Sequence, residues 1–326
     1  MNSNYLPTDY QTFIATSRYA RWLDSEGRRE TWGETVERYL DNIIKPVLED
    51  DNSNGHNAEV DLIRHHLLSL QVMPSMRSMM TAGKAAERDN TCMYNCSYLP
   101  VDDPKSFDEA MFILLCGTGV GFSVERQFIS KLPDIPTLFD SDTTVVIKDS
   151  KEGWAKGLRQ VLALLWAGEI PKWDVSKVRA AGKRLKTFGG RASGPAPLID
   201  LFNFTVTTFK GASGRKLSSI ECHDLMCKIG EVVVVGGVRR SAMISLSNLS
   251  DDRMRHAKSG NWWDNAAHRA LANNSVSYSE KPDSIAFMRE WTALMESGSG
   301  ERGIFNREAS IKQAAKNGRR ETCYEF

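Results

Sequence analysis

The sequence lacks several features that would assign it to a specialised class of protein. It has no run of about 18 apolar residues and does not open with a charged stretch followed by an apolar one, so neither a membrane span nor a secretory signal is expected. The net charge of +1 argues against bulk attraction to nucleic acid or to a membrane surface. We therefore expect a cytoplasmic protein without nucleic-acid or membrane partners.

Cysteine is scarce as well, with six residues among 326, which is too few for a disulfide scaffold in a chain of this length. Free thiols are expected. The pairs Cys92/Cys96 and Cys222/Cys227 do not have the C-x2-C spacing of a zinc site, and no second pair completes four ligands, so no metal site is predicted. The hydrophobic fraction of 41% and the charged fraction of 25% are those of an ordinary globular protein.

Hydrophobic periodicity predicts helices that alternate with strands. The expected helices lie at 10–22, 59–70, 107–115, 152–167, 197–209, 218–231, 285–297 and 305–316, and the expected strands at 97–101, 143–148, 232–235, 243–246 and 276–278. Thr31 followed by Glu34 is a capping-box pattern. The all-apolar run Val232–Val235 is typical of a strand that is buried on both faces. This alternation favours an α/β architecture with a parallel sheet.

The segment from Cys96 to Ser123 combines the features most indicative of a site. A cysteine opens an alternating strand, Asp102–Asp103–Pro104 forms a turn, and a helix follows. Three alternate glycines from Gly117 to Gly121 then leave the backbone open to close approach by a ligand. They fit neither a Walker A loop, since Phe122 stands where lysine is needed, nor a dinucleotide fingerprint, since a helix precedes them.

Two further loops combine glycine with cations. Residues 186–195 interleave Lys186 and Arg191 with glycines, a pattern that suits polyphosphate binding through backbone N–H groups and point charges. Residues 236–242 place Arg239 after two glycines, which offers a mobile loop with directional donors. The alternative for both loops is a solvated surface turn.

These segments resemble the large, catalytic subunit of ribonucleotide reductases, and most of all the small monomeric adenosylcobalamin-dependent (class II) ribonucleoside-triphosphate reductases, of which only the N-terminal portion is matched. The motifs that carry the resemblance, in family order, are R-Y-A-R-W (18–22), M-P-S-M-R-S-M-M (73–80), C-S-Y-L-P-V-D-D (96–103), D-S-K-E-G-W-A (149–155), F-G-G-R-A-S-G-P (188–195) and G-G-V-R-R-S-A (236–242). The resemblance implies an N-terminal helical region (1–70) followed by the first half of a ten-stranded α/β barrel (71–326), with effector-site loops and helices at about 180–242.

The resemblance also implies roles for individual residues. Cys96 would be one of two cysteines that reduce the ribose by closing into a disulfide; the alternative is a small buried side chain. Asp103 would accept a hydrogen bond from the effector's ribose hydroxyl; the alternative is an ordinary turn. The implied substrate-binding residues are Ser75, Asn95, Gly119, Gly121 and Arg239, and the implied effector-binding residues are Asp103, Lys186, Arg191 and Gly237.

The family's finger loop, N-P-C-x-E, which carries the radical cysteine, is expected after a strand at 321–326 and does not occur in the sequence. Three hypotheses follow: one part of a split or truncated reductase, a large subunit whose radical comes from a separate metal subunit, or a non-catalytic nucleotide-binding remnant. The first implies a ribonucleotide substrate, a deoxynucleotide or ATP effector, adenosylcobalamin, a C-terminal fragment that carries the finger loop, and a thioredoxin-like reductant.

Overall fold

The computed structural model describes residues 6–49, 56–183, 191–235, 242–316 and 318. The chain divides into two compact units, Met1–Asn95 and Cys96–Phe326. The domain boundary at residue 70 that the resemblance implies stays a prediction. Within the described residues, no helix is both long and apolar enough to span a bilayer.

The first unit is helical. Its elements are α1 (Asp9–Ile14), η1 (Ala15–Tyr19), β1 (Trp22–Leu23), β2 (Arg28–Arg29), α2 (Trp32–Tyr39), η2 (Leu40–Ile44), α3 (Lys45–Glu49), α4 (His56–Leu68), α5 (Met76–Thr81), α6 (Lys84–Arg88) and η3 (Asn90–Met93). The predicted capping box is confirmed, because Thr31 Oγ1 accepts from the Glu34 N–H at 3.2 Å and the Glu34 carboxylate accepts from the Thr31 N–H at 2.7 Å. Val36 and Leu40 are fully buried in the core behind this cap.

The second unit is built on one parallel sheet. Its strands, in spatial order, are β3 (Cys96–Pro100), β4 (Gly119–Ser123), β7 (Met243–Ser247), β8 (Ala272–Tyr278) and β9 (Gly303–Asn306). The predicted α/β class with a parallel sheet is thereby confirmed. These five parallel strands fit the first half of a ten-stranded barrel. The short strand β9 was not predicted, because its four residues adjoin the strongly helical pattern of α15 (Arg307–Lys316).

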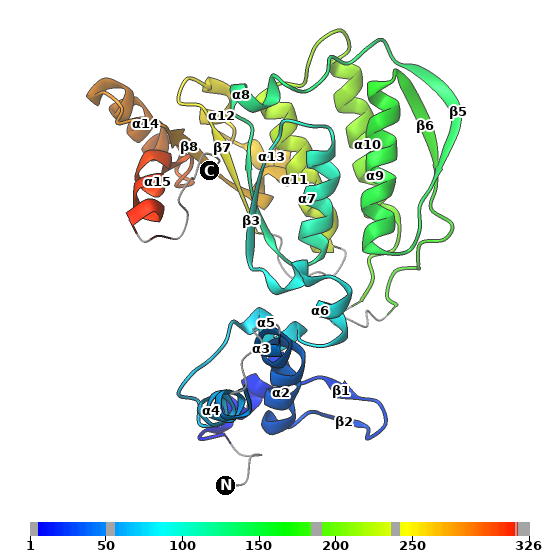
Figure 1. Ribbon diagram of the computed structural model, residues 1–326. Coiled ribbons are helices and arrows are strands. Elements are labelled where there is room, and N and C mark those ends of the chain that lie inside the picture. Colours follow the sequence, from blue (N-terminus) through cyan, green and yellow to red (C-terminus); the bar gives the residue numbers. More distant parts are fainter. Residues whose placement is uncertain (1–5, 50–55, 184–190, 236–241, 317, 319–326) are drawn as a thin grey trace. The chain divides into compact units, whose positions relative to one another are not determined.

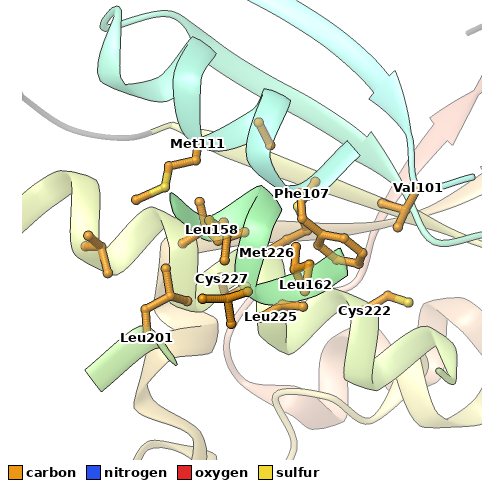
Figure 2. Packing of buried hydrophobic residues seen from close by; sticks show 14 of the residues in the cluster. Val101, Phe107, Met111, Leu158, Leu162, Leu201, Cys222, Leu225, Met226 and Cys227 are labelled. Carbon is orange, nitrogen blue, oxygen red and sulfur yellow. The ribbon is translucent and has the colours of Figure 1, made fainter. Parts of the chain in front are cut away.

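Four helices, α7 (Lys105–Leu115), α9 (Lys151–Trp166), α10 (Ala196–Gly211) and α11 (Ser219–Val235), pack side by side in the second unit (Figure 1). In Figure 2, Phe107 of α7 meets Leu162 of α9 and Met226 of α11 in the interior. The strands β5 (Phe139–Val146) and β6 (Glu169–Asp174) form a separate parallel pair beside α9. The smaller elements are α8 (Arg126–Ile129), α12 (Asp252–Arg255), α13 (Trp262–Ala266), η4 (Ala267–Leu271) and α14 (Ser284–Ser297).

The predicted strand at Val232–Val235 is wrong, because these residues form the last turn of α11. Val232 and Val233 are buried in the core of the helical layer, whereas Val234 is 39% exposed, so the run does not have two buried faces. β-Branched residues favour strands only weakly, and the packing of a helix that is already formed outweighs that preference.

Candidate functional site

Cys96 lies where the sheet offers an accessible thiol. It is the first residue of β3 and is exposed. The parallel register of β3 and β4 sets Cys96 opposite Gly119, and Ser97 Oγ donates to the Gly119 carbonyl at 2.9 Å. The first residues of β3 and β4 are thus held next to each other, so that the thiol of Cys96 lies beside the glycine backbone of Gly119. The alternative of a small buried side chain does not hold for Cys96.

Gly121 lies on the same face of the sheet as Gly119, because side chains alternate along a strand and the intervening Val120 packs into the helical core. A Cβ on Gly121 would stand 3.3 Å from Ile244 Cγ2 and 3.6 Å from Tyr98 Cδ2. Two neighbouring side chains therefore close over the strand at Gly121. The roles of Gly119 and Gly121 in substrate binding stay predictions.

The remaining described cysteines differ from Cys96 in their surroundings. Cys92, Cys116, Cys222 and Cys227 are buried thiols. Burial raises the pKa of the Cys222 and Cys227 thiols, which keeps both protonated and unreactive at neutral pH. Among the described residues, no three side chains of the His, Cys, Asp or Glu types are grouped closely enough to hold a metal ion.

An ion pair that the sequence analysis missed lies beyond the end of β4. Arg307 Nη1, at the start of α15, donates to Glu125 Oε1 at 2.9 Å, and Ser123 Oγ donates to Glu125 Oε2 at 2.7 Å. Burial alone would raise the pKa of Glu125, but the hydrogen bonds from Arg307 and Ser123 lower it on balance. The only local sign of this ion pair in the sequence is Glu125, which stands two residues after Ser123 at the end of a strand. Its partner Arg307 is 182 residues away in sequence.

Asp103 begins α7. Its Oδ1 accepts from the Lys105 N–H at 2.8 Å, and its carbonyl accepts from the Ser106 N–H at 2.9 Å. The side chain is exposed, so its carboxylate can meet a ligand as well as close the turn. The two interpretations of Asp103 are compatible in this geometry, and its role in effector binding stays a prediction.

Arg191 is the only predicted effector residue besides Asp103 that falls on the described residues. Its Nη1 donates to the Gly182 carbonyl at 3.0 Å, and Gly182 N–H donates in turn to the Ala192 carbonyl at 2.8 Å. These bonds close the base of the predicted cationic loop. Lys186 of the same loop, and Gly237 and Arg239 of the loop at 236–242, lie outside the described residues.

Two predicted substrate residues belong to the first unit. Ser75 caps α5, since its Oγ accepts from the Ser78 N–H at 3.2 Å, and it is exposed. Asn95 is exposed and directly precedes Cys96 in the chain. The contribution of both residues to a substrate site stays a prediction.

The comparisons with known proteins agree with these motifs. Residues 134–208, from β5 into α10, match the family described as "B12-dependent ribonucleotide reductase, insertion domain". The adenosylcobalamin-dependent ribonucleoside-triphosphate reductase of Lacticaseibacillus paracasei is 27% identical over 363 residues, covering 90% of this chain and 47% of that protein. The Lactobacillus leichmannii protein of the same name is 26% identical over 322 residues, covering 79% of this chain and 43% of that protein.

The solved structure of a B-12 dependent (class II) ribonucleotide reductase is similar to this chain with a TM-score of 0.76 and 24% identity, covering 92% of this chain and 49% of that one. The chain thus spans about half the length of the proteins it matches. In sequence and in fold it is similar to the N-terminal portion of adenosylcobalamin-dependent ribonucleotide reductases, as its motifs predict.

Proposed function

We propose that this chain is the N-terminal part of an enzyme that reduces ribonucleotides, as triphosphates, to 2′-deoxyribonucleotides. The observation that carries the proposal is the exposed thiol of Cys96, paired in register with the glycine backbone at Gly119 and flanked by motifs of the reductase family. The substrate class, the reaction and the cofactor are proposed from the similar proteins, which are adenosylcobalamin-dependent ribonucleoside-triphosphate reductases.

Cys96 acts as one half of the reductant. Replacing the ribose 2′-hydroxyl by hydrogen consumes two electrons and two protons and releases water, and two thiols supply both when they close into a disulfide. The second thiol and the radical cysteine come from a C-terminal polypeptide that carries the N-P-C-x-E loop. A thioredoxin-like dithiol then reopens the disulfide by exchange.

Adenosylcobalamin, when bound, supplies the radical that starts the reaction, and we assign no residue of this chain to holding it. The residues of this chain bind and orient the nucleotides. We assign Gly119 and Gly121, together with Ser75, Asn95 and Arg239, to binding the ribose beside Cys96. A deoxynucleotide or ATP effector binds at Asp103 and at the cationic loop with Lys186, Arg191 and Gly237.

The test joins this chain to the part of the L. paracasei reductase that follows the matched region and measures deoxynucleotide formation with dithiothreitol as reductant. We expect turnover that requires adenosylcobalamin, is lost in Cys96→Ser, and survives in Cys92→Ala, whose thiol is buried in the first unit. Repeated turnover by the Cys96→Ser fusion would refute the role of Cys96. Turnover that needs a metal subunit and no cobalamin would reassign the radical source.

A further inference from the structure

Tyr98 lies on the same face of the sheet as Cys96, two residues further along β3. Side chains alternate along a strand, so the two residues share a face and stand about 7 Å apart along β3. The next residue, Leu99, is buried on the opposite face, in the core that the sheet shares with the helices. The ring of Tyr98 is therefore the neighbour of the thiol that we assign to the reductant.

The ring of Tyr98 closes the space above Gly121. Tyr98, Gly121 and Ile244 stand in one row across β3, β4 and β7. A Cβ on Gly121 would already be in van der Waals contact with Tyr98 Cδ2 at 3.6 Å and would crowd Ile244 Cγ2 at 3.3 Å. The row of Cys96 and Gly119 is the adjacent one and carries the exposed thiol. The ring thus borders the row of the thiol on one side.

The hydroxyl end of Tyr98 is enclosed among buried charges. The hydroxyl oxygen is buried, and this burial raises the pKa of Tyr98, while attraction from Arg307 opposes the rise. Arg307 and Glu125 form an ion pair whose side chains are only 13% and 2% exposed, and Glu125 also accepts from Ser123 Oγ at 2.7 Å. A buried ion pair is costly to break, so it is a firm support. The ring is therefore backed on the side that faces away from Cys96.

We propose that Tyr98 is a positioning residue of the nucleotide site, and that its ring is the wall that keeps the ribose over Gly119, within reach of the Cys96 thiol. This inference rests on the proposed function and adds a residue to its site. A displacement of about 1 Å can slow a reaction between positioned groups about 100-fold. Because the wall supplies orientation while the rest of the nucleotide supplies affinity, its loss should lower kcat much more than it raises KM.

The first test uses the chain alone and measures how fast N-ethylmaleimide alkylates Cys96, with mass spectrometry of the digested protein as the readout. We expect Tyr98→Ala to react at least three times faster than the unaltered chain, because the ring no longer shields one side of the thiol. Tyr98→Phe keeps the ring and should react at a rate within twofold. Cys116, which is 1% exposed, should stay unreactive in every folded variant. If it reacts in Tyr98→Ala, Tyr98→Leu takes the place of that variant.

Leu99→Ala is the matched control. Leu99 belongs to the same strand and is 8% exposed, but it packs on the opposite face of the sheet. Its truncation should lower the melting temperature by opening a cavity in the core. The alkylation rate of Cys96 should nevertheless stay within twofold of that in the unaltered chain. The control thus separates a loss of stability from a change beside the thiol.

The second test measures turnover of the four ribonucleoside triphosphates by the fusion to the C-terminal part of the L. paracasei reductase. For Tyr98→Ala we expect kcat to fall at least tenfold and KM to stay within threefold. Tyr98→Phe and Leu99→Ala should both keep kcat within twofold of the unaltered fusion. A purely structural role of Tyr98 predicts instead that Leu99→Ala loses activity together with Tyr98→Ala.

The outcomes separate this inference from the proposed function. An active fusion in which Tyr98→Ala keeps its kcat would overturn the inference and leave the proposed function standing, as would an equal loss of kcat in Leu99→Ala. Unchanged alkylation of Cys96 in Tyr98→Ala would overturn the wall whether or not the fusion turns over. A fusion that is inactive without any substitution would refute the proposed function, and faster alkylation in Tyr98→Ala would then still support the ring as the wall beside Cys96.

Discussion

The first and the last βαβ units of the sheet share a topology but differ in how their helices are held. In β3–α7–β4, the helix buries Phe107, Met111 and Leu114 against neighbouring helices. In β8–α14–β9, the helix buries only Glu290. Two βαβ units of the same topology thus hold their helices differently: α7 is held by apolar packing, and α14 is held by the ion pairs of Glu290, which we call the ionic anchor. What differs is the set of elements that covers each helix, so burial in this fold is decided by neighbours and not by the unit itself.

The ionic anchor of the last unit is a network of charges in the interior. Arg302 and Glu290 both have side chains only 1% exposed, and Arg302 Nη1 also donates to the Asn248 carbonyl at 2.9 Å. Burial alone would raise the pKa of Glu290, but hydrogen bonding and attraction from Arg302 and Arg255 lower it on balance. A pair of this kind is costly to break from one side, because the remaining charge stays buried without a counter-charge.

The largest expected difference between the two βαβ units is in the unfolding free energy that is lost when an aromatic residue of each helix is replaced by alanine. Phe107→Ala should lower the free energy of unfolding by about 3–5 kcal/mol, because it opens a cavity in the packed core. Trp291→Ala should change it by less than about 0.5 kcal/mol in the chain alone, because the side chain is exposed. Urea denaturation followed by circular dichroism measures both values, and equal losses would remove the contrast between the units.

Glu290→Gln tests the ionic anchor. Removing one charge leaves Arg302 without its counter-charge and leaves Arg255 with Asp252 alone, so we expect a loss of about 3 kcal/mol, the lower end of the cost of breaking a buried pair. Native-state hydrogen exchange should show the loss in β9 and α14 and leave the amides of α7 unchanged. Unaltered exchange in β9 and α14 would mean that the last unit is held by something other than this network.

Asp103 and Asp283 lie just before the helices of the two βαβ units, where Asp283 is the N-cap of α14 and Asp103 stands one residue before the N-cap of α7. Asp283 Oδ1 accepts from the Ile285 N–H at 2.8 Å, much as Asp103 Oδ1 accepts from the Lys105 N–H. Asp283→Ala should cost about 1 kcal/mol of stability as a lost N-cap, and Asp103→Ala should cost about 1 kcal/mol as a lost hydrogen bond in the turn before α7. Only Asp103→Ala should also weaken effector binding, by about 1.5–3 kcal/mol, in calorimetric titration with deoxynucleotides. Equal effector affinity in the two variants would show that Asp103 stabilises the turn before α7 and does not bind the effector.

Acid should loosen the sheet around β4, in the βαβ unit β3–α7–β4, before it reaches the unit β8–α14–β9. His223 of α11 packs against Phe122 of β4, and burial lowers its pKa to about 3, with Asp224 opposing and Arg269 adding to the effect. The folded-state pKa lies below the unfolded value of about 6.5, so the contribution of neutral His223 to stability is complete above pH 6.5 and is lost as the pH falls toward 3.

By pH 5 the expected loss of unfolding free energy from His223 is about 2 kcal/mol. His223→Gln should be less stable than the unaltered chain at pH 7 but should lose less stability between pH 7 and pH 5. Urea titrations at the two pH values measure this difference. Parallel losses in the two proteins would show that His223 does not cause the acid sensitivity.

Sequence patterns predicted the parts of the fold that are determined locally. The strand from Cys96 and the helix α7 follow from alternation and helical spacing, and the capping box at Thr31 follows from two residues. The apolar run Val232–Val235 was wrongly predicted as a strand. It is helical because Val232 and Val233 pack against core residues that are distant in sequence. The ionic anchor of α14 could not be predicted, because the partners of Glu290 come from α12 and from the residue before β9.

In the candidate site too, the features set by local sequence could be predicted and the contacts between distant residues could not. An exposed cysteine beside glycine backbone was predictable, since a motif in the sequence places each, and the register between them came from the parallel pairing of β3 and β4. The ion pair between Glu125 and Arg307 could not be predicted, because no local sequence pattern links residues so far apart in the chain. The roles of the substrate and effector residues remain predictions that binding measurements decide.

The most direct test of the account is the redox state of Cys96 after one turnover. The fusion protein is loaded with substrate and adenosylcobalamin without external reductant, quenched in acid, alkylated and digested for mass spectrometry. We expect one disulfide per deoxynucleotide formed, joining Cys96 to a cysteine of the C-terminal part, while Cys92, Cys116, Cys222 and Cys227 are recovered as alkylated thiols. Product formation that leaves Cys96 alkylated as a free thiol would contradict it.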